Sequence, residues 1–240
     1  MPEHISRKEL KKDKIHDAIE HSAEALYSHK QVSSAVLLLA LMAALAYGGW
    51  TLYHERQTAR ASVAFDNAMK AYTGRIAGTS EAAESSEFSY KDEALRAADA
   101  QQKFQAVSDK YPHTTPGKLA RYYGALCLED LERHNQALEE LNKLSSGRDK
   151  ELASLAQYQS AVVYSRTGRL DQAIKVFRML ADKPSTLVPR PLALLELAGV
   201  LREKNPKEAT TIYEQIKKEF PGSAVSEEAE RKLDSLSPKS

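Results

Sequence analysis

The side chains most often used for catalysis and metal binding are sparse in this sequence and poorly spaced for joint action. The chain has one cysteine, Cys127, and its N-terminal region holds His4, His16, His21 and His29. His16 and His21 are five residues apart, which puts them on different faces of a helix, so solvated side chains explain them better than metal ligands. Adjacent carboxylates such as Glu139 and Glu140 are typical of a solvated helix face. We expect no metal and no cofactor.

Motifs and charge argue against several further classes of function. The chain has no glycine-rich phosphate loop, no nucleophile elbow, no Cys-x-x-Cys and no His-Glu-x-x-His motif. Its 34 Lys and Arg residues balance 33 Asp and Glu residues, and no part forms a basic patch for nucleic acid. Cys127 lies in an apolar stretch and is typical of a small core residue. We expect neither an enzyme nor a binder of nucleic acid or small-molecule substrates, so protein partners remain, with self-association as one form of such binding.

A long apolar segment dominates the N-terminal quarter of the chain. No charged residue occurs from Gln31 to Tyr53, and a helix over positions 32–53 would span about 33 Å, which matches a hydrocarbon core of about 30 Å. Apolar side chains occupy every face of this helix, and Trp50 and Tyr53 stand where a membrane helix meets the headgroups. A cleaved export signal and a buried core helix are the alternatives. The length and the polar residues before it favour a single-pass transmembrane anchor over residues 31–54.

The flanks of the anchor suggest its orientation. Four Lys residues lie in the 20 positions before Gln31, against three Lys or Arg residues in the 20 positions from His54 onward. This slight bias favours a cytoplasmic N-terminus. Residues 1–30 read as an amphipathic cytosolic tail, with a capping-box pattern at Ser6 and Glu9. The tail is either a helix lying at the membrane surface or a docking helix for a cytosolic partner.

The remainder of the chain is a series of helical repeats. Stretches beginning at Leu119, Leu155 and Leu192 align by eye. A small residue recurs every 37 positions in the first helix of each unit and every 36 positions in the second. These residues are Gly124, Ala161 and Ala198, then Ala137, Ala173 and Ala209, with Leu141, Phe177 and Tyr213 four positions after the second set. Small residues let paired helices approach closely, and the large ones fill the space to the next unit. The units must stack, because one pair cannot bury its apolar face alone.

The repeats extend toward both ends of this region. Ala100 and Phe104 stand in register one period earlier, so a first unit combines a helix over 61–72 with one over about 92–111. We expect a mobile loop over residues 74–89 between them, because small and polar residues dominate it. Ser89 is then predicted as the N-cap of the next helix. Thr115-Pro116 and Asn205-Pro206 predict helix starts, and Ser223 caps a closing helix.

The predicted fold class is therefore all-α. A single N-terminal transmembrane helix is followed by about four helix pairs over residues 55–222, and by a closing helix and tail over residues 223–240. No alternating strand pattern appears in the repeat region.

These repeats resemble the tetratricopeptide repeat. The unit from Leu155 matches the motif at or within one position of Ala161, Tyr164, Gly168, Ala173, Phe177 and Pro184. The segments FQAVSDKYP and YEQIKKEFP, from Phe104 and Tyr213, look like repeat proteins of bacterial cell envelopes. With a short tail and one anchor, the whole chain resembles the YfgM-type ancillary subunits of the SecYEG translocon. That resemblance implies a bacterial inner-membrane protein whose repeats face the periplasm, although the tail is longer and more charged than in that family.

The resemblance also implies a binding groove lined by the first helices of the repeats. The family's groove positions correspond to Lys118, Arg121, Tyr158, Val162, Arg166, Leu195 and Arg202. This mixture of apolar area and positive charge suits an extended peptide that carries carboxylates. The alternative is an ordinary surface, with Leu195 covered by the closing helix. Ala125 and Val162 replace the asparagine of the carboxylate-clamp type, so we expect no binding to a chaperone's acidic C-terminus.

Together these features predict an inner-membrane adaptor that binds proteins near the protein-export translocon. The partners would be translocon subunits, periplasmic chaperones or emerging polypeptides. Two other roles stay open on the sequence. One is a scaffold for cell-envelope or division assembly. The other is a membrane-bound regulator whose N-terminal tail docks a cytosolic partner.

Overall fold

The computed structural model describes residues 30–76 and 88–236, and these residues form an all-α fold, as predicted. The elements are α2 (Lys30–Tyr72), β1 (Arg75–Ile76), β2 (Ser89–Tyr90), α3 (Glu93–Lys110), α4 (Thr115–Asp130), α5 (His134–Ser145), α6 (Lys150–Arg166), α7 (Leu170–Asp182), α8 (Arg190–Lys204), α9 (Pro206–Glu219) and α10 (Ala224–Leu236). The predictions for residues 1–29 and for the loop between residues 77 and 87 lie outside the described residues. The chain divides into two compact units, residues 1–56 and 57–240.

The first unit contains the apolar part of α2. This helix is long and apolar enough to cross a membrane, with a mean hydropathy of 1.9 over its most apolar stretch. Its large side chains are exposed, including Leu37, Leu45 and Tyr47 at 68–69%. None of the residues that the structure describes covers them, which argues against the buried core helix that we weighed against an anchor. Length and composition of this kind also fit a signal sequence.

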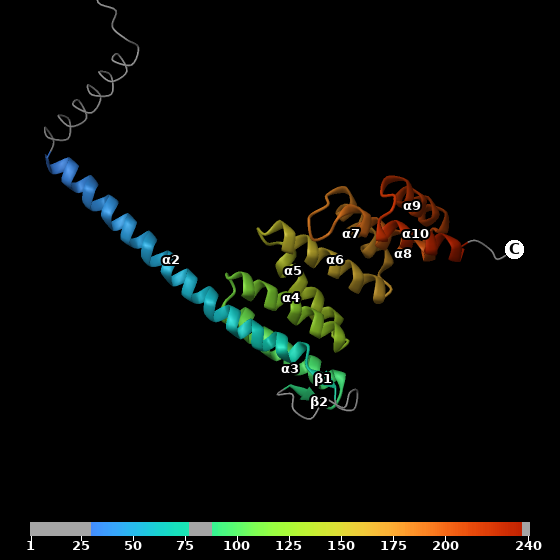
Figure 1. Ribbon diagram of the computed structural model, residues 1–240, viewed down its shortest axis with the longest axis horizontal. Helices are drawn as coiled ribbons and strands as arrows, with labels where there is room; N and C mark the ends of the chain where they lie inside the picture. The colour runs from blue at the N-terminus through green and yellow to red at the C-terminus, as the bar shows by residue number, and fades with distance from the viewer. Residues whose placement is uncertain (1–29, 77–87, 237–240) are drawn as a thin grey trace, which may run out of the picture. The chain divides into compact units, whose positions relative to one another are not determined.

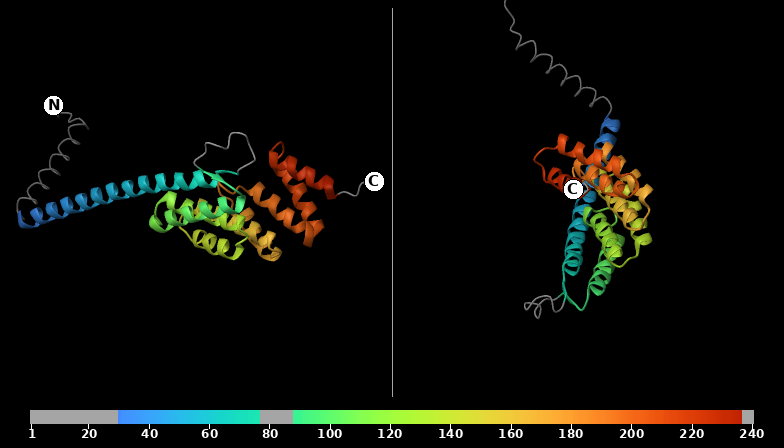
Figure 2. Two further views of the ribbon diagram at one scale, coloured as in Figure 1. Left: turned by 90° about the horizontal axis from the view of Figure 1, so that it is seen from below. Right: turned by 90° about the vertical axis from the view of Figure 1, so that its right-hand side faces the viewer.

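In the second unit, α4/α5, α6/α7 and α8/α9 are helix pairs, and the end of α2 forms a further pair with α3. Each helix from α3 onward packs against the next one along the chain (Figure 1; Figure 2). The closing helix α10 packs against α9 and α8. This confirms the predicted four pairs and closing helix.

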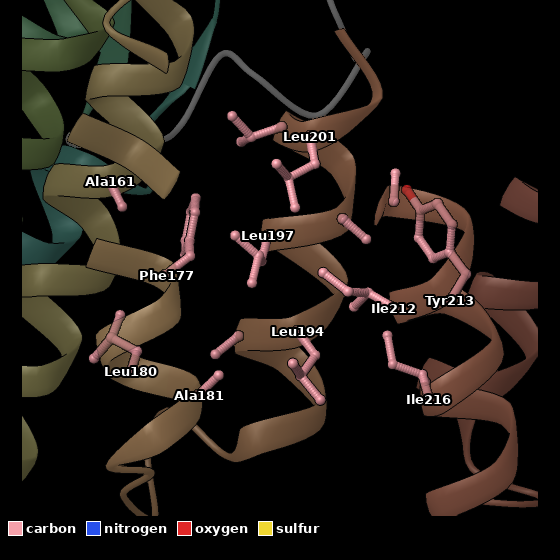
Figure 3. Packing of buried hydrophobic residues seen from close by; sticks show 14 of the residues in the cluster. Ala161, Phe177, Leu180, Ala181, Leu194, Leu197, Leu201, Ile212, Tyr213 and Ile216 are labelled. Carbon is pink, nitrogen blue, oxygen red and sulfur yellow. The ribbon is translucent and has the colours of Figure 1, made fainter. Parts of the chain in front are cut away.

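The small and large repeat residues lie where the helices meet. Ala161, Ala173, Ala198 and Ala209 are fully buried, and Phe177 and Tyr213 fill the space between units. Figure 3 shows the side chains of α8 between those of α7 and α9. In the first pair, Ala61, Ala68 and Ala71 of α2 pack with Ala100 and Phe104 of α3. The buried residues form three clusters along the repeats, and the partly buried Tyr123, Leu155 and Tyr164 each pack against two of them.

The start of α3 differs from the prediction. Ser89 is not its N-cap: it belongs to β2, which pairs in parallel with β1 through Arg75↔Ser89 and Ile76↔Tyr90. The cap is Asp92, whose backbone is extended and whose Oδ1 accepts a hydrogen bond from Leu95 N at 2.8 Å. The strand pair takes Ser89 away from the helix, and the first capable side chain after it performs the capping.

The other predicted helix starts are nearly correct. Asn205 caps α9 and accepts a hydrogen bond from Glu208 N at 3.3 Å, and Ser223 Oγ accepts one from Ser226 N. The cap of α4 is Thr114 rather than Thr115. Because Pro116 has no N–H, the first donor within reach is Gly117 N, which lies 3.1 Å from Thr114 Oγ1.

Candidate protein-binding groove

The seven predicted groove residues lie on the first helices of the second, third and fourth units. Lys118 and Arg121 are on α4, Tyr158, Val162 and Arg166 on α6, and Leu195 and Arg202 on α8. Hydrogen bonds join these helices in sequence: Arg166 of α6 contacts Glu129 of α4, and Tyr158 of α6 contacts Glu196 of α8. The first helices therefore form one row, but the seven side chains do not all have the same surroundings.

The middle of the row is apolar and partly buried. Val162 and Leu195 pack against the core of the third and fourth units. Tyr158 packs its ring edge-on against Phe177, with 5.7 Å between the ring centroids. Its hydroxyl donates to Glu196 Oε1 at 3.1 Å, and burial together with this carboxylate raises the pKa of Tyr158 above its ordinary value. A partner would meet only the exposed part of this ring.

Two charged members, Arg166 and Arg202, lie in the last turns of α6 and α8. Arg166 is 55% exposed at its side chain, and its Nη1 lies 3.5 Å from Oε2 of the buried Glu129. Glu129 Oε1 also lies 3.0 Å from Nδ1 of His134. Arg202 is exposed at the end of α8. Arg166 and Arg202 are therefore the members of the row that a partner can reach most readily.

Lys118 and Arg121 have a different setting, at the junction of the second and third units. They line a cavity of about 300 Å³ together with residues from the end of α5 and the start of α6. Arg121 Nη1 donates to Glu140 Oε2 of α5 at 2.8 Å, and both side chains are largely buried. The structure thus separates these two residues from the apolar centre around Tyr158.

Sequence reasoning missed three carboxylates: Glu129 and Glu140, which pair with Arg166 and Arg121, and Glu196, which accepts a hydrogen bond from Tyr158. They leave the row less positive than the sequence suggested. A signal was available for one pair, because Glu129 and Arg166 are 37 residues apart, the period of the first helices. Residues one period apart on stacked first helices are neighbours, so a search at that spacing would have found the pair.

The described residues offer little for catalysis. Among residues 30–76 and 88–236, no group of three His, Cys, Asp or Glu side chains could hold a metal ion. Cys127 is fully buried, and burial raises the pKa of its thiol to about 12. A thiol protonated at neutral pH is a weak nucleophile and a poor metal ligand. The four N-terminal histidines lie outside the described residues.

Comparison with known proteins agrees with the repeat architecture. A family model described as a tetratricopeptide repeat-like domain matches residues 27–238. No curated protein and no solved structure shows significant similarity to the chain.

Proposed function

Because this chain belongs to the tetratricopeptide repeat-like domain family, we propose that it is an adaptor that binds other proteins along the row of first helices. The observation that carries the proposal is the arrangement on α6 and α8. The partly exposed ring of Tyr158 and the aliphatic side chain of Leu195 share α6 and α8 with the exposed cations Arg166 and Arg202, which lie in the last turns of these helices. Aromatic and arginine side chains are the residue types that contribute most to binding at protein interfaces.

We further propose that residues 31–54 anchor the adaptor in a bacterial inner membrane, beside the protein-export translocon. The N-terminal tail would be cytoplasmic and the repeats periplasmic, with translocon subunits, chaperones or emerging polypeptides as partners. The apolar length of α2, the small excess of Lys before it and the resemblance to YfgM-type translocon subunits support this extension. Tethering would act by raising the local concentration of whatever the row binds.

The test is affinity purification of the full-length protein in a mild detergent, with mass spectrometry of the proteins that co-purify. Wild type is compared with a triple variant, Arg121→Gln, Tyr158→Phe and Arg166→Gln, which removes two positive charges and one hydroxyl group. The control changes the exposed Lys175, Met179 and Lys183 of the outer helix α7 and its end to Gln. We expect translocon subunits or periplasmic chaperones that the groove variant loses and the control retains.

Other outcomes would redirect the proposal. Division or cell-wall proteins would support a scaffold for envelope assembly. Partners that disappear on deletion of residues 1–30, and not in the groove variant, would support a regulator that docks through its tail. Equal recovery of all partners by the groove variant and the control would contradict binding along the first helices.

A further inference from the structure

The cavity between the second and third units has an unusual concentration of positive charge. It is lined by Lys118 and Arg121 at the start of α4, Lys143 at the end of α5, and Arg148 in the connection to α6. Asp149 is the one carboxylate that lines it, and its Oδ1 accepts a hydrogen bond from Leu152 N as the N-cap of α6. The cavity therefore presents four cations and one occupied carboxylate.

Two of these cations have partners and two do not. Arg121 and Lys143 both bind the carboxylate of Glu140, at 2.8 and 2.6 Å. The side chains of Lys118 and Arg148 form no ion pair or hydrogen bond with any residue that the structure describes, and the backbone N–H of Lys118 donates to Thr114 O within α4. Elsewhere in the array, a cation bridges neighbouring units: Arg166 of α6 pairs with Glu129 of α4 at 3.5 Å. The cavity leaves two cations available to an outside anion.

The positions of these two cations do not serve helix stability. Lys118 lies in the first turn of α4, and Arg148 lies immediately before the N-cap of α6. The N-terminal end of a helix carries a partial positive charge, so Lys and Arg are unfavourable there and Asp and Glu are favoured. Charges placed against the local preference are typical of a functional site.

Part of the cavity lining is apolar. Leu144 of α5 and Leu152 of α6 contribute to its lining and are otherwise buried, at 7% and 6% exposure. A volume of about 300 Å³ lies at the lower end of the range for ligand sites. It suits one or two side chains of an extended segment rather than a folded surface.

We propose that this cavity binds an acidic segment of a partner protein. A carboxylate would lie between Lys118 and Arg148, and a neighbouring apolar side chain would contact Leu144 and Leu152. The inference rests on the proposed adaptor function and specifies the chemistry of the partner. Charge complementarity selects the acidic residue, and the buried leucines select the apolar one beside it.

The experiment measures fluorescence anisotropy with the full-length protein in a mild non-ionic detergent. The probe is a dye-labelled peptide of roughly a dozen residues in which Glu and Leu alternate, and a matched peptide carries Gln in place of Glu. The double variant Lys118→Glu with Arg148→Glu is compared with Lys175→Glu and Lys183→Glu on the outer face of α7. The thermal midpoint of the cavity variant should equal or slightly exceed that of wild type, since Glu is favoured at the N-terminal ends of α4 and α6. That of the α7 control should stay close to wild type, since the side chains of Lys175 and Lys183 are exposed.

We expect the Glu peptide to bind and the Gln peptide to bind at least tenfold more weakly. The cavity variant should lose on the order of tenfold in affinity for the Glu peptide, and the α7 control should lose none. Added salt should weaken wild-type binding because the charges are close to solvent. Equal affinities for the two peptides, or for the two variants, would overturn the proposal, as would binding to phosphatidylglycerol vesicles without binding to the peptide.

Failure of the cavity proposal can be distinguished from failure of the adaptor proposal. A double variant, Tyr158→Phe with Arg166→Gln, leaves the cavity residue Arg121 unchanged. If the cavity variant keeps every partner that this double variant loses, the adaptor stands and the cavity proposal fails. If neither variant loses a partner and no peptide binds, both proposals fail.

Discussion

At the scale of single residues, Gly117 is the position that the backbone restricts most tightly. A Cβ there would lie 1.9 Å from the carbonyl oxygen of Tyr111, and a backbone atom cannot rotate aside as a side chain can. We predict that Gly117→Ala lowers the free energy of unfolding by about 3 kcal/mol, because the turn into α4 must distort. Thermal and urea unfolding followed by circular dichroism measure this.

Gly199 provides the matched control for this substitution. It lies inside α8, and a Cβ there would have no atom within 4 Å. Gly199→Ala should raise the free energy of unfolding by about 0.5–1 kcal/mol, since alanine favours the helix. Similar effects of the two substitutions would contradict the close packing at Gly117.

Tyr213 offers a second prediction, on hydrogen bonding. Its side chain is fully buried among core residues of α8 and α9 (Figure 3), and its hydroxyl has no hydrogen-bond partner among the described residues. Tyr213→Phe removes a polar group that has nothing to bond, so stability should stay unchanged or rise by up to about 1 kcal/mol. Tyr158→Phe, which loses the bond to Glu196, should lower stability by about 1 kcal/mol. Thermal midpoints in the reverse order would contradict this account.

We predict that the folded protein loses stability at high pH, because the hydroxyl of Tyr122 and the thiol of Cys127 are buried. Burial raises the pKa of Tyr122 to about 12 from an ordinary value of 10.0, and that of Cys127 to about 12 from 9.0. Both groups stay protonated in the folded state after the unfolded chain has begun to ionise. Their contribution to stability is therefore complete below pH 9 and declines as the pH rises toward 12.

Thermal midpoints measured from pH 8 to pH 12 test this pH dependence. In the variant with Tyr122→Phe and Cys127→Ala the decline above pH 9 should be shallower than in wild type, whatever the change in absolute stability. An identical slope in the two proteins would assign the alkaline effect to other groups.

At the scale of elements, the start of α3 shows how a helix end is selected. Asp92 accepts the hydrogen bond from Leu95 N, while Ser89 pairs with Arg75 in the short sheet. Asp92→Ala should therefore lower the free energy of unfolding by about 1 kcal/mol, and Ser89→Ala should change it little. Hydrogen exchange of the first turn of α3 localises the effect. Faster exchange in the Ser89 variant than in the Asp92 variant would contradict the observed cap.

The helix pairs and their order along the chain could be predicted from the sequence. The spacing of small residues such as Ala161 and Ala198 follows directly from helix packing, so the pairs and their order were correct. The strand pair could not be found, because two residues per strand give no periodicity to detect. The predicted N-cap of α4, Thr115, was one residue too late. Whether Thr114 or Thr115 can accept a hydrogen bond from Gly117 N depends on the local turn, which the sequence does not specify.

The candidate site was less predictable than the fold. Positions on the first helices follow from the repeat register, and Arg166 and Arg202 are exposed where a groove residue should be. Which side chains form ion pairs between helices depends instead on how each helix is rotated and shifted relative to the neighbouring helix. Neither composition nor motif showed that Glu140 would bind Arg121, or that Lys118 and Arg148 would share a cavity.

At the scale of the whole molecule, the repeat region from residue 57 to residue 236 is an array in which each helix pair packs against the next. The C-terminal core extends without a break from Ala161 of α6 through Phe177 and Tyr213 to Ala229 of α10. Such arrays offer a long surface to partners rather than one enclosed site. This is the property that a binding adaptor needs, and a tether would add to it by local concentration.

The most direct test of protein binding by the first helices is site-specific photocrosslinking in living cells. A photoreactive amino acid replaces Arg166 or Arg202 of the row in the full-length protein, and Lys175 or Met179 of α7 in the controls. The adaptor account predicts discrete protein crosslinks from the row positions and none of the same proteins from α7. Crosslinks that are absent from the row, or equal at both faces, would contradict it.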